Sequence, residues 1–219
     1  MRKIRVMYNK TGRAIYISHL DIMRTFQRAL KRAGIDVKHT EGFNPHPYIS
    51  IALPLSLGYS GRCEFLDMVV LDDMPCKEII ERLNKSLPEG IEATKAYDGG
   101  RPVREIAYSE FEITFEYDAG VPDGAVDKIR ELLMRDEIVI IKKSKSGEKE
   151  TNIAPMIKKP RVETGEGIVK ITVCLASGNV SLNPEYISKA VEKYLPDFVP
   201  DFAEYERLEV YNEKMEKFR

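Results

Sequence analysis

All three histidines of the 219-residue chain lie in one stretch, residues 17–47 (ISHLDIMRTFQRALKRAGIDVKHTEGFNPHP). Because histidine titrates near neutral pH, His19 or His46 can act as a general acid or base, with Tyr16 nearby in the sequence. These three residues define one candidate activity, a metal-independent endoribonuclease. The spacing of His19 and His46 matches no metal-ligand pattern, so no metal site is expected.

The other reactive residue types predict no further catalytic or cofactor site. Cys63, Cys76 and Cys174 are far apart in the sequence, and no CxxC or CxxxCxxC motif is present. The chain therefore has no cysteine motif for an iron–sulfur cluster of its own. Nucleophile-elbow, phosphate-loop and dinucleotide-binding motifs are also missing from the sequence. We expect no cofactor, and non-catalytic binding is favoured over enzymatic activity.

Positive charge is concentrated at the start of the chain. The first 62 residues contain eleven lysines and arginines against three acidic residues, a net charge of +8, whereas the whole chain carries −1. Such segregation indicates a polyanionic partner, RNA above all. The alternative is that these bases pair internally with the acidic remainder of the chain. The candidate RNA contacts are five basic residues and three side chains of the loop that follows: Arg13, Arg24, Arg28, Lys31, Arg32, Phe43, Asn44 and His46.

Residues 18–33 are predicted to form the helix that carries most of this charge. Ser18 can cap its first turn, and Gly34 stands where a helix commonly ends. Apolar residues recur at helical spacing on one face, and basic residues at i, i+4, i+7 and i+8 form a stripe on the other. An Asp21–Arg24 pair can neutralise only part of the stripe, for about 0.3–0.5 kcal/mol.

The segment that follows, 41–47 (EGFNPHP), is predicted to be a rigid loop. Its two prolines fix their own φ and restrict the residues before them, while Gly42 permits a backbone that other residues avoid. An exposed Phe43 beside Asn44 and His46 would suit base stacking with recognition of base edges. The alternative is that Phe43 is buried beneath the loop. Since Gly34 ends the helix, we expect residues 35–47 to fold back and place His19, Glu41, Asn44 and His46 at a common cleft.

The order of elements predicts an α+β protein with two tandem ferredoxin-like (βαββαβ) domains and antiparallel sheets. The first domain, 1–97, carries the stretch described above, and the second spans 106–212. The expected strands are 2–9, 48–55, 64–71 and 91–97, then 108–117, 137–143, 149–158, 167–175 and 203–211. The expected helices are 18–33, 75–86, 122–134 and 184–194.

The composition is that of a soluble globular protein, with 43% hydrophobic and 32% charged residues. No apolar run approaches the roughly 20 residues of a membrane span, and the N-terminus has no apolar stretch of the signal-peptide type. We therefore expect a cytoplasmic protein with no membrane partner.

Three motifs resemble those of the radical-SAM-linked protein family, a bacterial domain of unknown function. The first runs from Arg13 through Tyr16-Ile17-Ser18-His19-Leu20-Asp21, and the second is Arg28-Ala29-Leu30-x-Arg32-Ala33-Gly34. The third is Glu41-Gly42-Phe43-Asn44-Pro45-His46-Pro47, followed by Leu53-Pro54-Leu55-x-x-Gly58. The match is dense over about 13–66 and looser afterwards, where 152–157 (NIAPMI) and 207–211 are recognisable.

The resemblance implies an accessory protein that works beside a separate radical SAM enzyme, often encoded near ribonuclease G and ribosomal-protein genes. Together with the charge, it favours a protein that binds a tRNA, an rRNA or a ribonucleoprotein and presents it to that enzyme. Two alternatives remain: the endoribonuclease, and a protein-only scaffold for the radical SAM partner. The architecture expected here is also similar to that of CRISPR-associated RNA-processing endonucleases.

Overall fold

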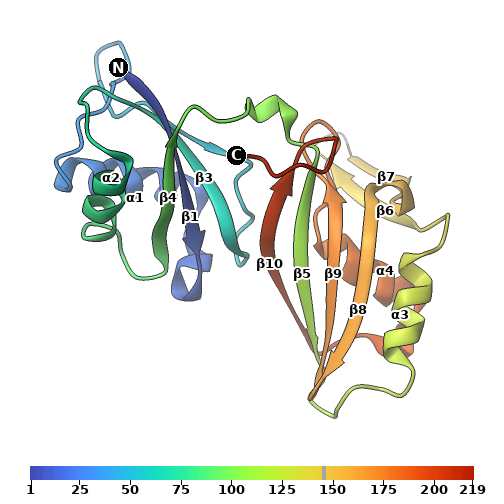
Figure 1. Ribbon diagram of the computed structural model, residues 1–219. Coiled ribbons are helices and arrows are strands. Elements are labelled where there is room, and N and C mark those ends of the chain that lie inside the picture. The colour runs from blue at the N-terminus through green and yellow to red at the C-terminus, as the bar shows by residue number, and fades with distance from the viewer. Residues whose placement is uncertain (145–146) are drawn as a thin grey trace. The chain divides into compact units, whose positions relative to one another are not determined.

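The computed structural model describes residues 1–144 and 147–219, which form two compact units. Unit 1 comprises residues 1–105 together with 218–219, and unit 2 comprises residues 106–217. Both units combine antiparallel strands with helices, so the predicted α+β class is confirmed (Figure 1).

Unit 1 follows the order strand, helix, two strands, helix, strand. Its main elements are β1 (Arg2–Lys10), α1 (His19–Arg32), β2 (Ile49–Ala52), β3 (Ser60–Val70), α2 (Cys76–Asn84) and β4 (Ile91–Asp98), with short 3₁₀ helices η1 (Gly12–Tyr16) and η2 (Val103–Glu105). The strands pair in the order β4-β1-β3-β2, and every neighbouring pair is antiparallel.

Alternating side chains of the unit 1 strands form a core with one face of each helix. Ile4, Val6 and Tyr8 of β1 are buried with Phe26 and Leu30 of α1. The rings of Tyr8 and Phe26 meet edge to face, with centroids 4.8 Å apart. Because burial of each large apolar side chain stabilises the fold by roughly 1.5–3 kcal/mol, these contacts fix α1 firmly on the sheet. The opposite face of α1 is therefore held toward solvent.

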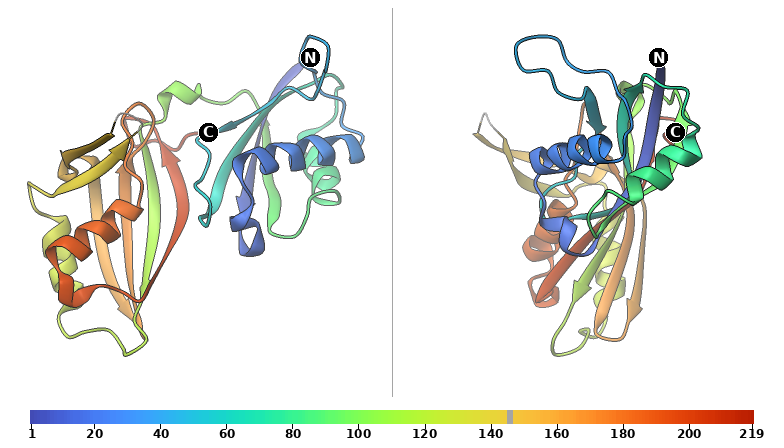
Figure 2. Two further views of the ribbon diagram at one scale, coloured as in Figure 1. Left: turned by 180° about the vertical axis from the view of Figure 1, so that it is seen from behind. Right: turned by 90° about the vertical axis from the view of Figure 1, so that its left-hand side faces the viewer.

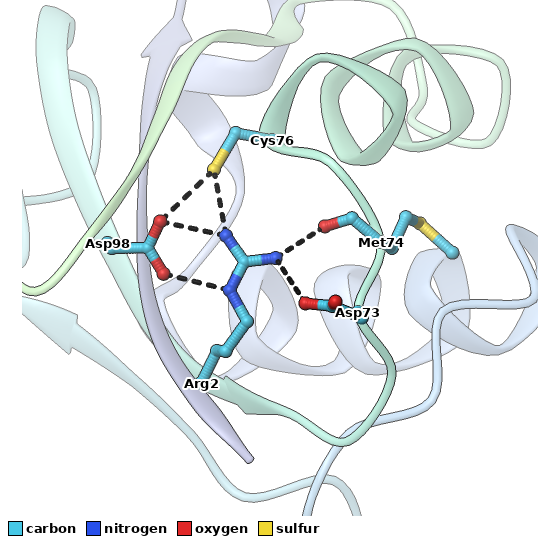
Figure 3. A network of polar contacts seen from close by, with 5 residues as sticks. All are labelled: Arg2, Asp73, Met74, Cys76 and Asp98. Carbon is cyan, nitrogen blue, oxygen red and sulfur yellow. Dashed lines mark hydrogen bonds and ion pairs between the residues drawn. The ribbon is translucent and has the colours of Figure 1, made fainter.

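A polar network at one end of the unit 1 sheet joins three elements (Figure 3). The Arg2 guanidinium donates to both carboxylate oxygens of Asp98, at 2.9 and 2.8 Å, and to the main-chain oxygen of Met74, at 2.9 Å. It also lies 3.7 Å from Asp73 and 3.8 Å from the Cys76 sulfur. Arg2 thereby ties the start of β1 to the end of β4 and the start of α2.

Unit 2 repeats the order of strands and helices seen in unit 1, with an additional hairpin of two strands. Its elements are β5 (Tyr108–Glu116), α3 (Ala125–Leu133), β6 (Val139–Ser144), β7 (Gly147–Asn152), η3 (Ala154–Met156), β8 (Ile157–Gly165), β9 (Ile168–Ala176), α4 (Glu185–Tyr194), η4 (Pro196–Phe198) and β10 (Phe202–Tyr211). One sheet has the antiparallel order β10-β5-β9-β8, and β6 pairs with β7 in a separate hairpin.

The prediction of one strand over residues 149–158 was wrong, because the structure divides this segment between β7 and β8. The Asn152 carboxamide oxygen accepts from the main-chain N–H groups of Ile138 and Ala154, which ends β7. A 3₁₀ turn containing Pro155 follows, and the chain becomes a strand again only at Ile157. The break separates β7, which pairs with β6, from β8, which joins the main sheet beside β9.

Candidate functional site

The start of α1 is held by the predicted cap. The Ser18 hydroxyl accepts from the main-chain N–H of Asp21, at 3.2 Å, and donates to the Asp21 carboxylate, at 2.7 Å. Arg24 donates to the same carboxylate at 3.1 Å. The Ser18 hydroxyl, followed by Arg24, lowers the pKa of Asp21, and the charge of Arg28 adds a weaker effect. Asp21 is therefore a neutralising partner within the stripe.

The end of α1 is a Schellman turn built on Gly34. The N–H of Ile35 donates to the oxygen of Leu30, and that of Gly34 donates to the oxygen of Lys31. Gly34 has φ of +63°, where a side chain would be strained. Ile35 and Leu30 are both buried in the unit 1 core, which supplies the apolar contact typical of this turn. The turn reverses the chain, as the position of Gly34 predicted.

The segment 39–47 forms a closed loop after this reversal. The N–H of Thr40 donates to the oxygen of His46, at 2.9 Å, and the N–H of His46 donates to the Thr40 hydroxyl, at 3.1 Å. Below this pair, Tyr48 donates its N–H to the oxygen of Lys38 at 2.8 Å. In the right-hand view of Figure 2 the light-blue loop rises above α1. Its base is thus closed by three hydrogen bonds, which leaves the tip free to meet a partner.

Phe43 stands at the tip of this loop with its side chain fully exposed, at 111% of the reference value. It does not fill the core beneath the loop, which was the alternative considered from the sequence. Neighbouring Asn44 and His46 are exposed as well. An exposed aromatic ring beside polar side chains is a combination that can stack on a base.

The basic residues of α1 fall into two groups. Arg24 pairs with Asp21, and Arg32 donates to the main-chain oxygen of Ser86 at 2.6 Å. Arg28 and Lys31 are exposed, and neither side chain makes a hydrogen bond or an ion pair within residues 1–144 and 147–219. These two cations keep their full capacity to bind an anion. Arg13, the remaining predicted contact, is exposed in η1.

Arg28 and Lys31 line a pocket between α1 and the loop. It has a volume of about 560 Å³. The helix contributes Gln27, Arg28, Leu30 and Lys31, the turn contributes Gly34, Ile35 and Asp36, and the segment after it contributes Val37, His39, Pro45, His46 and Pro47. The Gln27 carboxamide reaches the main-chain oxygen of Pro47 at 3.5 Å, which marks where the loop meets the helix.

Each of the two histidines of this pocket makes hydrogen bonds through its Nδ1 atom. The Nδ1 of His39 lies 2.9 Å from the oxygen of Val37, and the Nδ1 of His46 lies 3.2 Å from the oxygen of Asn44. Since a carbonyl oxygen only accepts, Nδ1 of His39 carries the hydrogen when its bond forms. The Nδ1 of His46 also lies 3.2 Å from the Thr40 hydroxyl, so it can donate to Asn44 or accept from Thr40. Nε2 of each ring has no protein partner in the described part of the chain.

The expectation that His19 and His46 share a common cleft was wrong. His19 is the first residue of α1 and lines a separate, much smaller pocket with Tyr8, Lys10 and Glu64. The loop returns instead to the C-terminal half of the helix, about 12 Å further along its axis at 1.5 Å per residue. His39, which had no role in the sequence-based interpretation, is the histidine that joins His46. The Pro47–His39 pairing across the closed loop brings them together.

The described residues contain no cluster of three or more histidine, cysteine or acidic side chains that could hold a metal ion. Tyr16 is 70% exposed and lies outside the pocket that His46 lines. Within the described chain, no helix is long and apolar enough to cross a membrane.

Comparisons with known proteins show a family and several distant solved structures, among them the two that follow. The family model described as an uncharacterized protein conserved in bacteria (DUF2344) matches residues 3–184. Among curated proteins, none matches the sequence. The "Crystal Structure of a Cbf5-Nop10-Gar1 Complex" aligns with 94% of this chain at 13% identity and a TM-score of 0.47, and this chain spans about half (48%) of the matched one. An unknown protein from Galdieria sulphuraria aligns at 14% identity and a TM-score of 0.27, covering 94% of this chain and 98% of that one.

Proposed function

We propose that this chain, which belongs to the DUF2344 family of uncharacterized bacterial proteins, binds RNA or a ribonucleoprotein and has no catalytic role. The proposed binding surface is α1 together with the loop 39–47. The observation that carries this proposal is a pair of exposed cations, Arg28 and Lys31, whose side chains make no hydrogen bond or ion pair with the described residues, together with the fully exposed ring of Phe43. Cations contact phosphates whatever the sequence, and an aromatic ring stacks on any base.

The charge distribution supports an RNA partner over a protein one. Residues 1–62 carry a net charge of +8, and the free cations lie on the solvent-facing side of the helix. Arg24 and Asn44 complete the proposed contacts on either side, with Arg13 and Arg32 in supporting positions. Binding of a fluorescent tRNA or rRNA hairpin at low salt tests the proposal directly, and a protein without measurable affinity for either RNA would contradict it.

The bound RNA would be presented to a separate radical SAM enzyme. This part of the proposal rests on the resemblance of residues 13–66 to the radical-SAM-linked family. A pull-down of the radical SAM enzyme from the native bacterium, with and without ribonuclease treatment, tests it. We expect capture of the enzyme to depend on RNA. If the protein has no affinity for RNA and still captures the enzyme after ribonuclease treatment, the protein-only scaffold is favoured.

We also propose that each unit is a ferredoxin-like domain, with 1–97 and 106–212 as the domains. The strand orders β4-β1-β3-β2 and β10-β5-β9-β8 support this, because in each four-stranded order the first and third strands along the chain lie in the middle. In unit 2 the hairpin β6–β7 would be an insertion after the first helix. Expression of 106–217 alone, with a cooperative thermal transition, is the expected outcome for an independent domain.

A further inference from the structure

We propose that the pocket between α1 and the loop 39–47 receives one unstacked nucleotide of single-stranded RNA. The inference rests on the proposed RNA-binding function and deepens it, because it names the feature of the RNA that is recognised. The phosphate lies against Arg28 and Lys31, and the base enters between the helix and the proline-flanked side of the loop.

The size and the lining of the pocket suit a nucleotide. Its volume of about 560 Å³ lies within the range of roughly 300–1,000 Å³ that is usual for sites of small ligands. Leu30, Ile35 and Val37 give it an apolar floor, and Pro45 and Pro47 form an apolar wall. A flat base can pack against these surfaces without burying polar protein groups.

The polar groups of the pocket converge from two elements. Arg28 and Lys31 lie one turn apart on the helix, and His39 and His46 face them from the loop. The side chains of both cations, and the Nε2 atoms of both histidines, make no hydrogen bond or ion pair with the described residues. The cations suit a phosphate, and a neutral Nε2 can accept from a ribose 2′-hydroxyl or a base N–H group. Asp36, the acid of the lining, repels a second phosphate and so favours one nucleotide over a run of them.

A duplex cannot use such a pocket. Its bases are paired and stacked, so that only phosphates and riboses face a protein outside the grooves. Phe43 lies outside the pocket lining and can stack on a neighbouring base of the same strand. The pocket therefore predicts a preference for single strands that the positive charge of α1 alone would not produce, because charge alone attracts duplex and single-stranded RNA alike.

Two matched pairs of variants test the inference. Arg28→Gln and Lys31→Gln remove cations that line the pocket, whereas Arg24→Gln and Lys38→Gln remove the same charges from positions outside its lining. The affinities of the full chain for a single-stranded RNA decamer and for a duplex of the same sequence are measured by fluorescence anisotropy at one salt concentration. The expected result is a fall of about tenfold in the single-strand preference for Arg28→Gln and Lys31→Gln. The control variants Arg24→Gln and Lys38→Gln should weaken the binding of both RNAs equally and leave the single-strand preference unchanged.

The possible results separate this inference from the function on which it rests. If all four variants change the preference equally, or if the unmodified protein binds both RNAs alike, the pocket is not a nucleotide site, although the protein still binds RNA. If neither RNA binds at low salt, the proposed function itself is wrong. Titration with a nucleoside 5′-monophosphate, followed by the NMR signals of the histidine rings, provides a second readout. Shifts of His39 and His46 with His19 unmoved are expected, whereas equal shifts with inorganic phosphate alone would show that only an anion is bound.

Discussion

Arg24 and Arg28 lie one turn apart on the same face of α1, yet only Arg24 reaches a carboxylate. Arg24 donates to Asp21 at 3.1 Å, while Arg28 borders the pocket beside the loop and its side chain makes no hydrogen bond or ion pair with the described residues. The difference follows from the Ser18 cap, which holds the Asp21 carboxylate at the first turn, three residues from Arg24 and seven from Arg28. The position of one acid thus decides which arginine remains free for a partner.

The Ser18 cap is expected to stabilise α1 measurably. Ser18→Ala leaves the main-chain N–H of Asp21 without its acceptor, so the free energy of unfolding of the protein should fall by about 1 kcal/mol. Ser18→Thr keeps an acceptor and should recover most of this loss. Urea denaturation followed by circular dichroism measures both variants. Equal stability of the alanine variant and the unmodified protein would show that the cap contributes nothing.

Acid should weaken the junction that Arg2 makes between β1, β4 and α2. The hydrogen bond from Arg2 lowers the pKa of Asp98 in the folded protein. The contribution of the Arg2–Asp98 pair to the stability of the fold is therefore complete above the unfolded-state pKa of about 3.9. It is lost as the pH falls through the lower pKa that Asp98 has in the folded protein. Arg2→Gln should lower the melting temperature at pH 7 and reduce its dependence on pH below about 4. The same substitution at exposed Arg104 should change neither, and a pH profile of Arg2→Gln parallel to that of the unmodified protein would refute the coupling.

Phe43 should matter for RNA and not for folding. Its side chain has no core contacts to lose, so Phe43→Ala should leave the melting temperature unchanged. If the ring stacks on a base, RNA affinity should fall by about 1–3 kcal/mol, with little dependence on salt. Phe43→Tyr keeps a ring and should bind normally. Anisotropy titrations at two salt concentrations distinguish this loss from a loss of charge contacts, and an alanine variant that binds as tightly as the unmodified protein would remove Phe43 from the interface.

Purified protein should not cleave RNA in the presence of EDTA. His19 and His46 line separate pockets, and Tyr16 lies outside the one that His46 lines, so the groups considered for acid–base catalysis do not converge. Incubation with total RNA, followed by gel electrophoresis, should yield no defined fragments. Defined cleavage that disappears in a His19→Ala or His46→Ala variant would instead establish the endoribonuclease.

Local features of the site were predictable because neighbouring residues determine them. Ser18, Asp21 and Gly34 mark the ends of α1 by their hydrogen-bonding and backbone preferences, and the Asp21–Arg24 pair requires only helical spacing. The α+β class followed in the same way from the periodicity of apolar residues. These features depend on contacts within one turn of helix or one strand.

Features that depend on contacts distant in the sequence were not predictable. Arg32 donates a hydrogen bond to the main-chain oxygen of Ser86, beyond the end of α2, so one of its donors is already used within the protein. His46 lines its pocket together with His39 because the loop closes through Thr40 and returns to Gln27. No local sequence pattern specifies that register. A histidine that follows a helix-ending glycine, with a proline-flanked histidine shortly after it, is the only signal that could have suggested the pair.

The salt dependence of RNA binding tests the central claim most directly, that α1 and its loop bind RNA through free cations. If three to four phosphates are contacted, the logarithm of affinity should fall against the logarithm of salt concentration with a slope of roughly −3, at ~0.7–0.9 per phosphate. Replacing Arg28 and Lys31 together with Gln should make this slope about 1.5 units shallower, whereas the paired Arg24 should contribute less when replaced alone. A slope near zero, or a slope that the double variant leaves unchanged, would contradict the account.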